Sequence, residues 1–184
     1  MDIDQQTASA LGFPKLEYVS VERERRWLCH EVPRERVART EAISDLYVTG
    51  GRLRLREARP IDGGAPRLRL SRKADVDPYA RLITSIYLTE EEFAVLAACL
   101  PGACIKKLRH RLQHVPGALL AVDEFQGELG GLILAEAEFE TPEQLAAFPT
   151  PDFAVREVTL DPRFTGGYLV KNGPPGNLPD EHLS

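Results

Sequence analysis

The feature that most restricts the fold is a strict alternation of charged and apolar side chains, which returns in segment after segment. The stretch GRLRLRE puts Arg52, Arg54 and Arg56 on one face and leucines on the other, and RLRLSRK, which ends at Lys73, repeats the pattern. A period of two is typical of an amphipathic β-strand. The connecting PIDGGAP contains two glycines that can adopt positive φ, so an antiparallel hairpin is predicted.

Further stretches have the same character, and helices are few. Strands are predicted over residues 21–28, 80–88, 105–112, 118–125, 129–140 and 153–160, in addition to the hairpin. Capping boxes predict one helix opened by Thr89 and Glu92 and another opened by Thr141 and Gln144, and a third is expected between residues 33 and 43. About eight strands favour an α+β fold: an eight-stranded antiparallel closed β-barrel with a few short helices packed outside, since closure removes unpaired edges.

The segment VERERRWL contains an unusual concentration of like charge. On a strand, Glu22, Glu24 and Arg26 share one face. Two carboxylates two residues apart lie roughly 7 Å from each other, which costs about 2.4 kcal/mol at an effective dielectric constant of 20. Several such pairs inside a barrel therefore need compensation from basic side chains, water or a divalent cation.

The charged faces of the predicted strands differ in sign. The acidic faces carry Glu22 with Glu24, Asp123, and Glu136 with Glu138; the basic faces carry Arg52 with Arg54 and Arg56, Lys73, and Lys107 with Arg109 and Arg111. One interpretation is that each face meets water, as in a half-buried antiparallel sheet. The other is that the sheet curls with these faces inward, so that basic residues can chelate a linear chain of phosphates and the acidic wall holds Mg²⁺.

Length and charge limit the other options. The chain has 184 residues, which suits one compact domain, and a net charge of −5, which argues against a nonspecific nucleic-acid binder. No stretch approaches the roughly 20 apolar residues of a membrane helix, and the N-terminus has no signal-peptide pattern, so a cytoplasmic location is expected. Three cysteines without CxxC spacing indicate neither a disulfide framework nor a zinc site.

The order of these motifs resembles that of the CYTH superfamily, the triphosphate tunnel metalloenzymes. VERERRWL is similar to the family's ExExK signature, with Arg26 in the lysine position. ISDLYVTGGRLRLRE resembles the segment that leads into the Arg-x-Arg strand, LSRK the strand that ends in a substrate-binding lysine, and IKKLRHRL the Lys-x-Arg strand. AVDEFQGELGGLILAEAEFE resembles the Asp-bearing hairpin that ends in Glu-x-Glu, and REVTLD the terminal Glu-Val-Thr element.

This resemblance, which extends from about residue 17 to residue 170, implies a tunnel that binds a small-molecule triphosphate and Mg²⁺ or Mn²⁺. The residues expected to bind phosphate are Arg52, Arg54, Arg56, Lys73, Lys107 and Arg109. Arg69, Arg111 and Glu157 are further possible site residues. The expected metal ligands are Glu22, Glu24, Asp123, Glu136 and Glu138, and the expected catalytic residues are Glu22, Glu24 and Arg26.

The implied activity is a phosphohydrolase that acts on triphosphate anhydride bonds, with inorganic tripolyphosphate ahead of thiamine and nucleoside triphosphates. Two departures from the family pattern bear on it: Arg26 cannot act as a base as a lysine can, and acidic residues that many relatives carry near Thr84 are missing. These departures leave open a noncatalytic polyphosphate- or nucleotide-binding protein, and formation of cyclic AMP is a third alternative. Dimers are common in the family, so a homodimer is also an option.

The expected domain organisation is simple. Residues 1–16 are predicted to form an N-terminal extension and residues 17–171 the tunnel domain. Residues 172–184 are rich in proline and glycine and are predicted to form a flexible tail.

Overall fold

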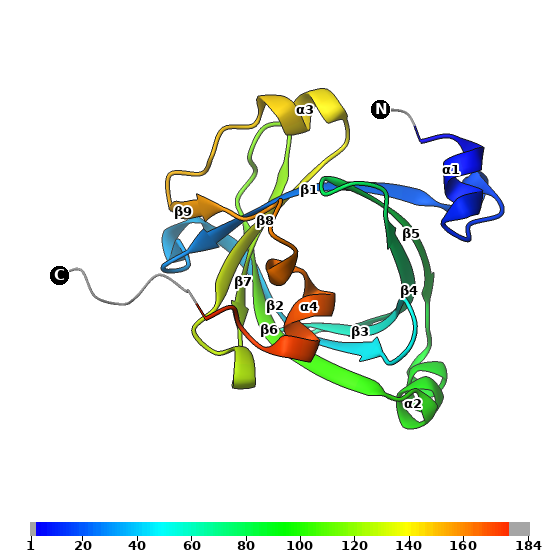
Figure 1. The fold of residues 1–184 in the computed structure, drawn as a ribbon. Coiled ribbons are helices and arrows are strands. Elements are labelled where there is room, and N and C mark those ends of the chain that lie inside the picture. Colours follow the sequence, from blue (N-terminus) through cyan, green and yellow to red (C-terminus); the bar gives the residue numbers. More distant parts are fainter. Residues whose placement is uncertain (1–2, 177–184) are drawn as a thin grey trace.

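The computed structural model describes residues 3–176, which form one antiparallel sheet with a few short helices around it (Figure 1). The strands are β1 (Ser20–Cys29), β2 (Val37–Val48), β3 (Leu53–Pro60), β4 (Arg67–Asp75), β5 (Ala80–Tyr87), β6 (Gly102–Leu112), β7 (Leu119–Phe125), β8 (Ile133–Phe139) and β9 (Ala154–Glu157). The α-helices are α1 (Gln5–Ala10), α2 (Glu90–Cys99), α3 (Pro142–Ala147) and α4 (Gly166–Asn172).

Eight of the strands close into a barrel. Their order is β5-β4-β3-β2-β6-β7-β8-β1, and β5 pairs with β1 to complete the ring. Strand β1 is long enough to serve both neighbours, since residues 20–23 pair with β5 and residues 23–28 pair with β8. Strand β9 pairs with the far end of β1 and stands outside the ring. The predicted closed antiparallel barrel is therefore confirmed.

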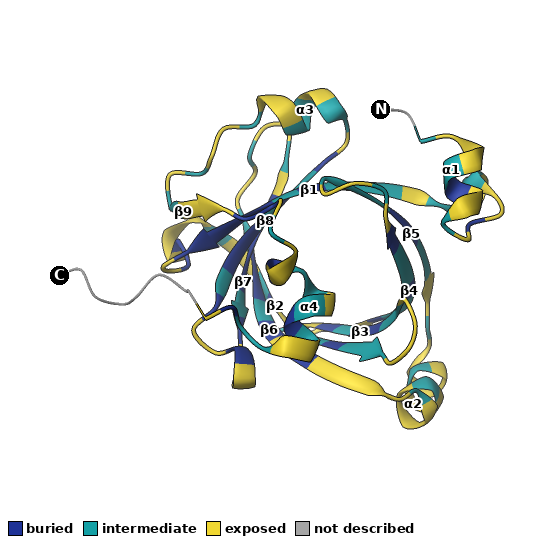
Figure 2. Cartoon of the chain, in the orientation of Figure 1, coloured by how far each residue is buried: buried dark blue, intermediate teal, exposed yellow. Residues whose placement is uncertain are grey.

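Buried residues recur along the strands of the barrel (Figure 2), and many of the apolar ones pack against segments outside the ring. On one side Trp27 is fully buried, and its ring lies 6.0 Å from that of Phe148, which follows α3. On another side Ala8 of α1 and Phe13 pack with Leu82 of β5. Because apolar side chains occupy the outward positions, the alternating positions on the same strands leave charged side chains facing inward.

The predicted glycine turn and the two predicted helix caps are confirmed. Gly63 and Gly64 have φ of 99° and 119° in the β3–β4 turn. Both predicted capping boxes are present, at the starts of α2 and α3.

The prediction of a helix between residues 33 and 43 is wrong. Only a single 3₁₀ turn, Arg34–Arg36, precedes β2, a strand of twelve residues. Strand β2 pairs with β3 on one side and with β6 on the other, so long-range pairing decides its conformation. Glu41, Ile43, Asp45 and Tyr47 share one face of this strand, and because that face mixes charged and apolar side chains, the strand has no simple polar–apolar alternation.

The two ends of the chain differ in what is described. The predicted N-terminal extension contains α1, whose Ala8 packs on the barrel. The predicted tail begins at Asn172, the last residue of α4, and its residues 177–184 lie outside the described residues. Within residues 3–176, the helices are all too short or too polar to cross a membrane.

Candidate functional site: a charged tunnel

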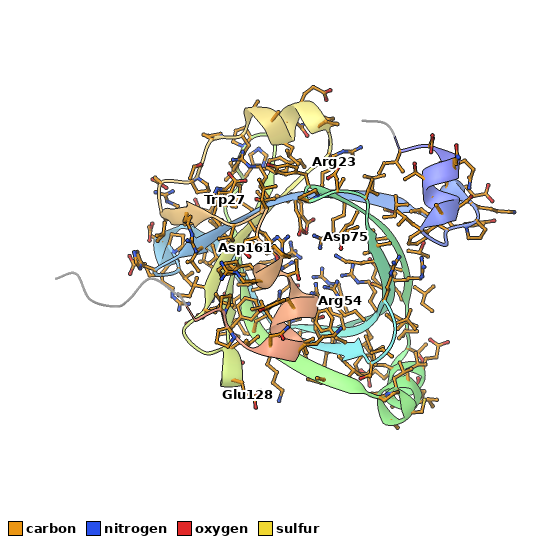
Figure 3. All side chains as sticks on the ribbon, viewed as in Figure 1. Arg23, Trp27, Arg54, Asp75, Glu128 and Asp161 are labelled. Atoms are coloured by element: carbon orange, nitrogen blue, oxygen red, sulfur yellow. The ribbon has the colours of Figure 1, made fainter. Side chains whose placement is uncertain are left out.

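The inward-facing side chains line a cavity that is almost entirely charged. Figure 3 shows Arg54 pointing into the ring of strands. The basic side chains that line the cavity are Arg26, Arg54, Arg56, Arg69, Lys73, Arg81, Lys107, Arg109 and Arg111, and the acidic ones are Glu22, Glu24, Glu136 and Glu138. Nine basic groups against four acidic ones make the lining a site for an anion of high charge.

Strands β3 and β4 supply an arginine cluster that is only partly neutralised. Arg56 donates two hydrogen bonds of 2.6 Å to the carboxylate of Asp45, whereas the Nε of Arg54 lies 3.7 Å from that carboxylate. Within residues 3–176, Arg69 forms no ion pair, and burial together with repulsion from Arg56 and Arg54 lowers its pKa. The cluster therefore holds uncompensated positive charge inside the cavity.

Lys73 adds to this charge from the same face of β4, four residues after Arg69. Its ammonium donates a hydrogen bond to Glu22 of β1. Burial and the nearby Arg54 lower the pKa of Lys73 to about 8. For Glu22, burial alone would raise the pKa, but the positive charge of Lys73 outweighs it and the pKa falls to about 2. Lys73 thus keeps its proton less readily than an ordinary lysine.

A second basic group comes from β6 and is held by a buried carboxylate. Asp123 of β7 accepts hydrogen bonds from Lys107 Nζ at 2.5 Å and from Arg109 at 2.6 and 2.7 Å. Arg109 also donates to Glu136 of β8. Burial opposes the charged form of Glu136, but Arg109 and Lys107 outweigh it and lower the pKa of that carboxyl. The side chain of Asp123 is only 1% exposed, so it does not reach the cavity itself. Its role is to orient Lys107 and Arg109 through these hydrogen bonds.

The acidic wall lies on β1 and β8, where like charges oppose each other. Glu24 is the direct register partner of Glu138, a geometry in which two carboxylates destabilise each other. Arg81 of β5 lies 2.9 Å from Glu24, yet burial, helped by Glu136 and Glu22, raises the pKa of Glu24. Glu138 has no ion-pair partner among the described residues.

These carboxylates fit a hard divalent cation in chemistry, since oxygen donors of excess negative charge face one another there. No three carboxylate, imidazole or thiol groups of residues 3–176 are gathered into a ready-made cation site. Glu24 and Glu138 are the residues that would hold such a cation, which would supply positive charge to the two carboxylates.

One end of the tunnel is closed by apolar side chains. Phe164, which ends the 3₁₀ turn Pro162–Phe164, and Leu169 of α4 pack against inward-facing residues such as Leu28 and Leu134. Gly166 lies so close to Tyr47 that a Cβ at this position would come within 1.9 Å of the hydroxyl oxygen. The segment Asp161–Gly173, called here the closing segment, thus fits tightly into this end.

The opposite end is open and less polar. Tyr18, Tyr87 and Leu119 are 67%, 75% and 66% exposed and line a wider pocket there. Glu22, Arg69 and Glu138 line both this pocket and the tunnel, so the two are continuous. The open end is therefore the route by which a ligand can reach the charged interior.

Not every predicted site residue lies on the tunnel wall. Arg52 is exposed ahead of β3, Asp123 sits behind Lys107 and Arg109, and Glu157 pairs with Arg25 on the outer strand β9. The other predicted residues line the cavity together.

Sequence reasoning missed some residues of the site. Arg81 and Tyr47 line the tunnel, and Asp45 orients Arg56. The inward parity of β2 and the single arginine of ARLITSIYL were the signals that could have identified them.

Comparisons with known proteins agree with this geometry. No protein-family model matches the chain. An inorganic triphosphatase of Acetivibrio thermocellus is 48% identical over 68 residues, which cover 37% of this chain and 42% of that protein. The match thus spans less than half the length of this curated relative.

Solved structures cover more of the chain. That of the inorganic triphosphatase NE1496 has a TM-score of 0.56 and 24% identity, and the alignment covers 84% of this chain and 97% of that one. The chain has the fold of this inorganic triphosphatase structure. The fold is also similar to that of PH1819 from Pyrococcus horikoshii OT3, with a TM-score of 0.54, 21% identity and coverage of 68% of this chain and 82% of that one. The resemblance inferred from the order of the tunnel motifs is confirmed.

Proposed function

We propose that this protein hydrolyses a small-molecule triphosphate inside the tunnel, with inorganic tripolyphosphate as the first candidate. The observation that carries the proposal is Arg69, a guanidinium opposite Arg56 and near Arg54 that has no carboxylate partner among the described residues. Repulsion within this cluster is unfavourable in the ligand-free protein, and a chain of phosphates would turn it into attraction. The inorganic triphosphatases of matching sequence and fold support the same substrate class.

The residues divide into three roles in this proposal. Arg54, Arg56, Arg69 and Lys73 bind phosphate oxygens from one side, and Lys107 and Arg109, oriented by Asp123, bind them from the other. Guanidinium groups stabilise the charge on the phosphoryl group as it transfers to water, so most of the rate enhancement comes from positioning and electrostatics. A carboxylate of the acidic wall orients the attacking water.

Mg²⁺ or Mn²⁺ is the proposed cofactor. Glu24 and Glu138 would hold it, with Glu22 and Glu136 beside them. When bound, the cation supplies charge neutralisation for the phosphate oxygens. The proposal of a metal rests on the direct register pairing of Glu24 with Glu138, which places two carboxylates side by side on the acidic wall.

The experiment is a panel of tripolyphosphate, ATP and thiamine triphosphate with Mg²⁺ or Mn²⁺, assayed for phosphate release. Glu24→Gln should lower kcat about 100-fold or more, because loss of an outer-sphere partner alone typically costs 10–100-fold. The matched control is Glu57→Gln, on the outer face of β3, where Arg59 is the only ion-pair partner of Glu57 among residues 3–176.

Three outcomes would change the proposal. Binding of these triphosphates by calorimetry without turnover would indicate the noncatalytic alternative, for which Arg26 in place of a lysine is the motivating feature. Absence of both binding and turnover would disprove the proposal. Release of cyclic AMP from ATP would indicate cyclase chemistry.

The remaining expectations are part of the same proposal. A cytoplasmic location suits a substrate of this class, and a homodimer remains a prediction that sedimentation can test. The division into an extension, a tunnel domain of residues 17–171 and a tail is likewise a proposal.

A further inference from the structure

Arg26 contacts both the closing segment and the residues just before it, Val158 and Thr159, which is more than a role in phosphate binding requires. Its backbone N–H donates to Thr159 Oγ1 at 2.9 Å, and its carbonyl accepts from the backbone N–H of Val158 at 2.8 Å. Its side chain reaches further, because Nη1 donates at 3.0 Å to the carbonyl of Phe164. Strand β1 is thus joined to the C-terminal part of the chain at three atoms of one residue.

The same guanidinium faces the acidic wall. Its Nε lies 3.4 Å from Glu24 Oε1, and both side chains are almost completely buried. This Nε makes no hydrogen bond with any described residue. A buried donor without a partner is costly, so this guanidinium is held between two partners rather than satisfied by one.

We infer that Arg26 is a positioning residue that couples the closing segment to Glu24, an inference that rests on the proposed function. One planar group with donors in fixed directions can hold a carbonyl on one side and a carboxylate on the other, whereas a lysine ammonium is a single point charge. A structural role therefore explains why an arginine occupies this position. That role does not involve proton transfer, which a guanidinium cannot perform.

The coupling has a direction. A cation held by Glu24 competes with Arg26 for the carboxylate and repels the guanidinium, which then has the Phe164 carbonyl as its remaining acceptor. Binding of Mg²⁺ therefore strengthens the attachment of the closing segment. Conversely, loss of the Arg26 contact loosens α4 and leaves Glu24 without one of its two arginine partners.

Hydrogen exchange of the α4 backbone amides tests this in the full-length protein. In the ligand-free state Arg26→Lys should speed exchange of the Leu169 and Gly173 amides about tenfold, as expected for losing a hydrogen bond from a charged donor. Mg²⁺ should slow this exchange in the original protein and have no effect on it in Arg26→Lys. The matched control is Arg81→Lys, since Arg81 also pairs with Glu24 but has no hydrogen bond to the closing segment.

Each outcome decides the inference. It is overturned if Mg²⁺ leaves α4 exchange unchanged in the original protein, a result that needs no variant to fold. It is also overturned if Arg26→Lys keeps the response, or if Arg26→Lys and Arg81→Lys lose it equally. If the protein hydrolyses tripolyphosphate but Mg²⁺ does not slow α4 exchange, the proposed function is upheld and the coupling is rejected. If Mg²⁺ slows α4 exchange but no triphosphate is hydrolysed, the coupling is upheld and the proposed function is rejected. Absence of Mg²⁺ binding by calorimetry would reject the coupling, whereas the proposed function would still be decided by the triphosphate panel with Mn²⁺.

Discussion

The two ends of the barrel are built from the same strands and yet differ completely in what they bury. On β1 the inward positions Glu22, Glu24 and Arg26 line the charged cavity, and the next inward position, Leu28, belongs to the apolar closed end. On β8 the positions Glu138 and Glu136 lead in the same way to Leu134. Strand parity decides only which residues point inward. Whether they meet a ligand or a packed core depends on the closing segment, which covers one end and leaves the other open.

The largest expected effect is at the closed end. Phe164→Ala should lower the free energy of unfolding by about 3–5 kcal/mol, because a buried phenyl ring is lost and a cavity remains. Urea titration followed by the fluorescence of Trp27, the single tryptophan of the chain, would measure it. A loss below about 1 kcal/mol, as is usual for surface sites, would mean that Phe164 does not hold this end closed.

The charged end should respond in the opposite sense. Arg69→Gln removes repulsion from Arg54 and Arg56, so the ligand-free protein should be as stable as the original or slightly more stable. Affinity for tripolyphosphate should nevertheless fall by roughly 10- to 100-fold, the range for one hydrogen bond to a charged group. Calorimetry and urea titration on the same sample would separate the two effects. A loss of stability with unchanged affinity would contradict the proposed role of the arginine cluster.

The pH dependence of binding sharpens the same comparison. Lys73 has a pKa of about 8 in the ligand-free protein, and a bound polyanion favours its protonated form. Above pH 8 binding must therefore take up a proton, so affinity should weaken as pH rises, by up to about tenfold per unit. Well below pH 8 Lys73 is already protonated, so it should add nothing to the pH dependence of affinity.

The control for this experiment is Lys73→Arg, which keeps its charge throughout and thus cancels the titration of the ligand itself. Calorimetry in two buffers of different ionisation enthalpy would count the protons. Equal pH profiles for the two proteins would show that Lys73 does not contact the phosphates.

The smallest effect is expected at Arg52. This residue was predicted to share the phosphate-binding face of Arg54 and Arg56, but it lies exposed ahead of β3 and does not line the cavity. Arg52→Gln should change the free energy of unfolding by less than about 0.5 kcal/mol, as for other surface sites. Tripolyphosphate affinity should also be nearly unchanged. A tenfold loss of affinity would restore Arg52 to the site.

The sequence by itself determined the strands, their inward faces and most of the tunnel lining. Alternation is a local property of the backbone, so Arg54, Lys73 and Glu24 could be assigned to charged faces without knowing the fold. Capping boxes and the glycine turn are equally local, and they were confirmed.

Only the tertiary structure decided which residues meet across the barrel. The pairing of Asp45 with Arg56, the place of Asp123 behind Lys107, and the contact between Arg26 and the carbonyl of Phe164 join residues that are 11, 16 and 138 positions apart. Strand β2 shows the same limit, because its conformation follows from pairing with β3 and β6. Closure of the ring and seating of the closing segment are long-range events that depend on the whole chain, and no short window of sequence contains them.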